Sequence, residues 1–138
     1  MTIEENIEAA LFDRVRTLAM SPDLPLAWPN NSFVPPSPLS TYLRVDLFRN
    51  RNERIGIKGS APHRRPGILQ ITVVASLNAG PSAATAIAGQ VAEHFPADLL
   101  LDYDGVTVRV TSAPDVLSAE KEDASWDVPV SVPWVSYS

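Results

Sequence analysis

The segment Trp126-Asp-Val-Pro-Val-Ser-Val-Pro-Trp-Val135 decides the fold, because its apolar residues recur with a period of two. The even positions carry large apolar side chains, which is the pattern of a strand with one buried face: Trp126, Val128, Val130, Val132 and Trp134. Pro129 and Pro133 both occupy odd positions, and the backbone N–H groups of odd positions all point to one side. Since proline lacks an N–H, that side cannot carry a full hydrogen-bonded ladder. We therefore expect an edge strand, or a strand whose odd side faces a partner that needs few donors.

Further strands are predicted on both sides of a helical segment. Residues 41–49 alternate apolar and other side chains, and residues 67–76 are rich in β-branched residues, which favours a place near the middle of a sheet. Residues 99–103 and 106–111 flank Asp104-Gly105, a strong signal for a β-hairpin turn. A short edge or irregular strand is expected at residues 24–28, where Pro25 removes a donor.

Two helices complete the pattern. Thr2 and Glu5 form a capping box in front of an amphipathic helix over residues 3–19. Pro81 suits the first position of a second helix over residues 81–95. The element order predicts an α+β fold, in which a mostly antiparallel twisted sheet of about five to six strands has both helices on one face. No boundary is visible, so residues 1–138 are expected to form a single domain.

The composition limits the possible chemistry. The chain contains no cysteine, which excludes disulfides, cysteine-based zinc sites and thiol nucleophiles. His63 and His94 are its only histidines, and no nucleophile elbow, phosphate loop, dinucleotide fingerprint or zinc-protease motif is present. We therefore expect no enzymatic activity, no metal and no cofactor. The acidic N-terminal residues, and the lack of an apolar run of about 20 residues, predict neither a signal peptide nor a membrane span.

The charges are divided along the chain, although the net charge is only −5. Six of the eleven basic residues lie in a stretch expected to be a loop or a splayed hairpin tip: Arg49, Arg51, Arg54, Lys58, Arg64 and Arg65. Acidic residues gather in an expected loop over residues 112–125: Asp115, Glu120, Glu122 and Asp123. The two sets are candidate interface residues, because opposite charges on two surfaces can complement each other between neighbouring subunits. Two solvated loops of opposite sign explain the same pattern equally well.

A nucleic-acid-binding module that uses the basic loop 49–65 is an alternative hypothesis. Its cations would contact phosphates, and affinity would then fall steeply with salt. The loop has no aromatic residue on which a base could stack.

The order and spacing of several segments resemble those of a known family. The segments are the N-terminal helix, Leu26-Ala-Trp-Pro-Asn30, Phe33-Val-Pro-Pro36, Tyr42-Leu-Arg-Val45, Arg65-Pro-Gly-Ile-Leu-Gln-Ile-Thr-Val73, His94-Phe-Pro96, Gly105-Val-Thr-Val-Arg-Val110 and Val128-Pro-Val-Ser-Val-Pro-Trp134. Together they resemble the phage tail terminator-like (tail-completion) proteins of siphophages and prophages.

The resemblance implies a structural virion protein with an α+β fold. Such a protein forms a ring, usually a hexamer, that caps the tail tube, ends its polymerisation and offers a surface for head joining. The implied partners are other copies of the chain, the tail tube protein and a head-completion or connector protein, with possible non-specific DNA contact. The implied location is the virion tail, and the bacterial host cytoplasm during assembly. The resemblance implies no catalytic residue and no cofactor.

Overall fold

The computed structural model describes residues 2–18, 24–34, 41–59, 61–77, 80–122 and 125–138. Its helices are α1 (Ile3–Arg16) and α2 (Ser82–Glu93). Its longer strands are β2 (Tyr42–Arg49), β4 (His63–Ser76), β5 (Leu100–Tyr103), β6 (Val106–Val110) and β9 (Ser125–Tyr137). Four strands have two residues each: β1 (Leu26–Ala27), β3 (Glu53–Arg54), β7 (Asp115–Val116) and β8 (Glu120–Lys121).

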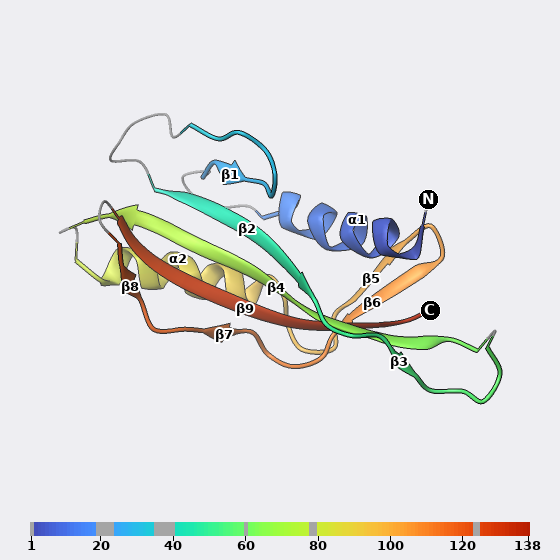
Figure 1. Cartoon of the computed structure of the whole chain (residues 1–138). Coiled ribbons are helices and arrows are strands. Elements are labelled where there is room, and N and C mark those ends of the chain that lie inside the picture. Colours follow the sequence, from blue (N-terminus) through green and yellow to red (C-terminus); the bar gives the residue numbers. More distant parts are fainter. Residues whose placement is uncertain (1, 19–23, 35–40, 60, 78–79, 123–124) are drawn as a thin grey trace.

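Within these residues, one sheet follows the strand order β1-β2-β4-β9-β6-β5, as Figure 1 shows. The strand β3 is added to β4, and β7 and β8 are added to β9. The sheet is mixed, because β1 runs parallel to β2 while the other pairs are antiparallel. The α+β class is thus confirmed. The expectations that both helices share one face of the sheet, and that residues 1–138 form a single domain, stay predictions.

The strand β9 lies in the middle of the sheet, so the edge-strand expectation is wrong. Its residues pair with β4 over the whole length from Arg64↔Tyr137 to Ser76↔Ser125. The backbone groups of its odd-numbered residues face β6, β7 and β8, and these strands pair with it only in short stretches. The prolines take part there as acceptors, since Thr111 N–H donates to the Pro133 carbonyl at 3.1 Å and Leu117 N–H to the Pro129 carbonyl at 2.9 Å. The other expectation, a partner that needs few donors, is confirmed.

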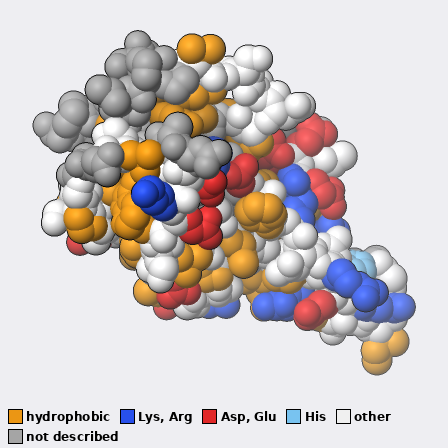
Figure 2. Space-filling model, turned by 60° about the vertical axis from the view of Figure 1, so that its left-hand side comes forward, with side chains coloured by type: hydrophobic (Ala, Val, Ile, Leu, Met, Phe, Trp, Pro, Cys, Tyr) orange, Lys and Arg blue, Asp and Glu red, His pale blue; other side chains and the backbone are white. Residues whose placement is uncertain are grey.

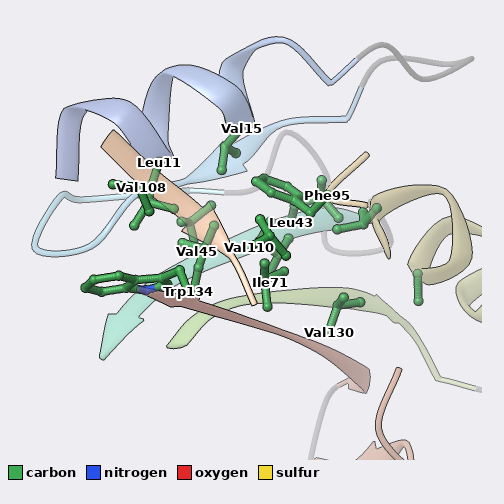
Figure 3. Packing of buried hydrophobic residues seen from close by; sticks show 14 of the residues in the cluster. Leu11, Val15, Leu43, Val45, Ile71, Phe95, Val108, Val110, Val130 and Trp134 are labelled. Carbon is green, nitrogen blue, oxygen red and sulfur yellow. The ribbon is translucent and has the colours of Figure 1, made fainter. Parts of the chain in front are cut away.

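The even positions of β9 form the centre of the core. Val128, Val130, Val132 and Trp134 are at most 2% exposed, and Trp126 packs against the same cluster. Figure 3 shows Leu11 and Val15 of α1 above Val130 and Trp134 of β9, with Val108 and Val110 of β6 and Ile71 of β4 close by. The predicted hairpin is confirmed, with Asp104 and Gly105 both at positive φ in its turn.

Hydrogen bonds connect the C-terminal ends of the two helices. The Arg14 side chain donates through Nε and Nη2 to the His94 carbonyl, at 3.1 and 2.8 Å. In return, His94 Nε2 lies 2.9 Å from the Arg14 carbonyl and 2.8 Å from Thr17 Oγ1. Because the Thr17 hydroxyl already donates to the Arg14 carbonyl, His94 Nε2 must carry the proton. The helix α1 begins at its capping box as expected but ends at Arg16, and α2 ends at Glu93, so both expected helices are too long.

Replacing Gly67 with alanine should destabilise the protein. Gly67 lies opposite Trp134, and a Cβ atom there would overlap the Trp134 ring and the Phe48 carbonyl. We expect the free energy of unfolding to fall by about 1–3 kcal/mol in chemical denaturation, as for other overpacked cores. Gly89→Ala is the matched control, because it lies within α2 with nothing near its missing Cβ, and it should raise stability by up to about 1 kcal/mol. Equal effects of the two substitutions would contradict the argument.

The contact between the helix ends should make stability depend on pH. Burial lowers the pKa of His94, with the nearby Arg14 charge adding to the effect and the hydrogen bond to the Arg14 carbonyl opposing it. The folded protein therefore binds fewer protons than the unfolded chain below the ordinary value of 6.5. The free energy of unfolding should therefore fall as the pH drops through this value, whereas His94 should add no pH dependence well above it. His94→Gln keeps a donor but cannot titrate, so denaturation at several pH values should show a weaker dependence in this variant.

Candidate functional site

The basic stretch of the sequence forms a projecting arm. We define the basic arm as residues 50–66, and its strand β3 pairs with the first residues of β4 through Glu53↔Arg64 and Arg54↔His63. Figure 1 shows this hairpin extending beyond the body of the sheet. The splayed hairpin is thus confirmed. The strand β4 begins at His63 and not at Gly67, because His63 and Arg64 pair with β3 and residues 64–66 pair with β9.

Three of the predicted basic residues are engaged within the chain. Arg49 at the end of β2 makes an ion pair with Glu8 of α1 at 3.0 Å. Arg65 pairs with Glu4 of α1 at 2.7 Å, and its side chain is only 15% exposed. Arg64 pairs with Glu53 across the hairpin at 3.3 Å. Arg49 and Arg65 therefore fasten α1 to the base of the arm.

The other three basic residues are Arg51, near the base of the arm, and Arg54 and Lys58, toward its end. Arg54 donates to the carbonyls of Gly56 (2.9 Å) and Ile57, and so holds the shape of the turn. Arg51 and Lys58 are exposed and have no carboxylate partner in the part of the chain that the structure describes. These two cations are the ones most available to a binding partner.

The arm ends in an apolar tip that the sequence analysis missed. The side chain of Ile57 is 95% exposed and that of Ile55 is 54% exposed. Figure 2 shows basic side chains along the arm and hydrophobic ones at its end. The signal was available in the sequence, since Ile55-Gly-Ile57 is an apolar pair inside an otherwise charged, glycine-containing stretch.

The acidic residues lie on a second surface. We define the acidic segment as residues 115–122, which carries β7 and β8 along the odd side of β9 and so is not the loop that we expected. Asp115, Glu120 and Glu122 are exposed. Asp123 lies outside the described residues. Val116 and Leu117, at 42% and 45% exposure, add an apolar element between the acids.

A single chain does not bring the two surfaces together. The β3–β4 pairing continues the arm past His63, whereas Leu117 is bonded to Pro129, which lies opposite Thr72 near the other end of β4. Strands rise about 3.3 Å per residue, so about 12 residues of strand separate the arm tip from Leu117 by roughly 40 Å. Charge complementarity between the two surfaces therefore requires two copies of the chain.

Among the described residues a metal cluster is absent, and the pocket beside Trp134 is small. Among these residues, no group of three or more His, Asp or Glu side chains is placed to hold a metal ion. The pocket beside Trp134, lined by Glu4, Arg49 and Arg65 among others, has a volume of about 20 Å³. Small-molecule sites usually enclose about 300–1,000 Å³. Neither described helix has the length and apolar character that a membrane span requires.

Replacing single arginines with alanine should distinguish those that stabilise the fold from those that are available to a partner. Arg65→Ala removes a largely buried side chain that also reaches the Ser138 carbonyl, so the free energy of unfolding should fall by about 1 kcal/mol. Arg51→Ala is the control and should stay within about 0.5 kcal/mol of the parent protein. Chemical denaturation measures both values. A larger loss for Arg51 than for Arg65 would contradict the assignment.

Comparisons with known proteins fit this structural picture. A family model described as phage tail terminator protein matches residues 6–134. One solved structure has a sequence 28% identical to this chain and superposes on it with a TM-score of 0.77. The superposition covers 96% of this chain and 94% of the other. No curated protein matches the sequence.

Proposed function

The chain belongs to the phage tail terminator family, and from this premise we propose that it closes the end of a phage tail tube. In this proposal, copies of the chain form a ring, most simply a hexamer, on the last ring of tube protein. The ring ends tube polymerisation and presents its outer face to a head-completion or connector protein. The family is structural, which fits a role in virion assembly and not in catalysis. The protein would assemble in the host cytoplasm and remain in the virion tail.

The observation that carries the proposal is the family match over nearly the whole chain. The geometry supports it, because the basic arm and the acidic segment are two different surfaces of one subunit, far apart and of opposite charge. A contact between two different surfaces repeats from subunit to subunit and closes into a ring when the rotation permits. Self-assembly of this kind is what a tube cap requires.

The comparisons lend no support to the nucleic-acid alternative. The arm keeps Arg51 and Lys58 exposed, and a ring could direct them toward DNA in the lumen, but a contact of this kind would be non-specific. A filter-binding assay over a salt series checks it, since contacts to phosphates require a steep salt slope.

Reversing the available charges should impair assembly without unfolding the subunit. For Arg51→Glu with Lys58→Glu, we expect a smaller ring fraction in light scattering after size exclusion, and fewer capped tubes in negative-stain images of polymerising tail tube protein. Arg109→Glu is the control, because Arg109 is exposed and its strand β6 belongs to neither surface, although the change also removes the ion pair with Asp98. Rings of the parent protein should weaken as salt rises.

Two results would count against the proposal. Tubes that grow to the same lengths with and without the protein would contradict the terminator function. If the double reversal assembled and capped tubes as well as the parent protein, the charged surfaces would not be the assembly contacts, even if the function held.

A further inference from the structure

The apolar tip of the basic arm is a built structure and not a loose loop. Arg54 donates to two carbonyls of the turn, and Ala61 N–H donates to the Lys58 carbonyl at 3.0 Å. Gly56 lies so close to Ala61 that a Cβ atom at Gly56 would overlap the Ala61 side chain. These contacts fix the shape of the turn in which Ile55 and Ile57 are exposed to solvent.

A matching apolar surface exists on the acidic segment. Val116 pairs with Val130, and Leu117 N–H bonds to the Pro129 carbonyl, so both residues are held on the central strand of the sheet. Asp115 and Glu120 lie on either side of them along the chain. The arm tip combines apolar side chains with the opposite charge, since Arg54 and Lys58 flank its isoleucines along the chain.

We propose that Ile55 and Ile57 of one copy dock on Val116 and Leu117 of a second copy of this chain, with the arm cations facing the acids of the segment. An apolar centre with a charged rim is the usual anatomy of a protein interface. The positive charge of the arm favours an acidic partner surface. The acidic segment of a second copy is such a surface, and it also carries exposed apolar residues. The separation of roughly 40 Å within one subunit makes the contact intermolecular. The inference rests on the proposed ring, for which it supplies the subunit contact.

Crosslinking tests this contact directly, because the chain has no cysteine of its own. Ile57→Cys and Leu117→Cys proteins are mixed and treated with a short bis-maleimide, alone and with tail tubes added. We expect a covalent dimer that contains one chain of each variant. The matched control is Val34→Cys, which is 85% exposed and lies on neither surface. If Ile57→Cys couples no better to Leu117→Cys than to Val34→Cys in either condition, the contact is wrong.

A charge series at the tip gives a second measurement. Ile57→Glu and Ile57→Lys both remove the apolar side chain, but only glutamate would face the acidic segment with a like charge. We expect Ile57→Glu to weaken self-association roughly tenfold or more, as for an interface anchor, and Ile57→Lys to weaken it less. Thermal unfolding of each subunit should remain unchanged. Equal weakening by both variants, or none, would overturn the proposed pairing with the acidic segment.

The outcomes separate this contact from the proposed function. Capped tubes without the 57–117 crosslink would reject the contact and leave the terminator function standing. The crosslink in a protein that does not cap tubes would support the contact and reject the function. If Ile57→Cys couples instead to a tube protein that carries an introduced surface cysteine, the arm faces the tube and the self-docking is wrong.

Discussion

The long antiparallel pairing of β4 with β9 is the contact on which the rest of the structure depends. It runs from Arg64↔Tyr137 to Ser76↔Ser125 and places the valines of β9 in one buried cluster with residues of both helices. At Gly67 the absence of a side chain makes room for the Trp134 ring. The pairing also determines where the two candidate surfaces lie, because the arm is the continuation of β4 and the acidic segment is attached to the other side of β9.

The ion pairs of α1 connect the body of the protein to the arm. Glu4 and Glu8 lie one helical turn apart and reach Arg65 and Arg49 on neighbouring strands. Two members of the basic cluster are therefore part of the fold, and Arg64 is occupied by Glu53. The charge that remains for a partner is smaller than the sequence suggests, with Lys58 near the exposed isoleucines and Arg51 near the base of the arm.

Local patterns in the sequence predicted most of the elements and their types. The alternation in residues 41–49 and 126–135, the capping box at Thr2 and the Asp104-Gly105 turn are short-range signals, and each corresponds to an observed element. The position of β9 was not predictable in this way, because a proline lacks a donor but keeps its carbonyl, and Pro129 and Pro133 use theirs. The ion-pair partners of Arg49 and Arg65 were also not predictable from local patterns, since they are about 40 to 60 residues away along the chain. For the candidate site, the two charge clusters were visible in the sequence, whereas the apolar tip became meaningful only when the hairpin placed it at the end of a projecting arm.

The central place of β9 also bears on how the chain folds. It follows every other strand in chain order, yet it alone joins the half-sheet β1-β2-β4 to the half-sheet β6-β5. Until β9 has been synthesised, β4 and β6 both expose an unpaired edge, and such edges invite pairing between chains. The contacts that close the sheet span about 60 residues of sequence, which predicts slow folding. The subunit should therefore become assembly-competent in one late step, when β9 inserts between the two half-sheets, so that partly made chains have no complete acidic segment to offer a neighbour.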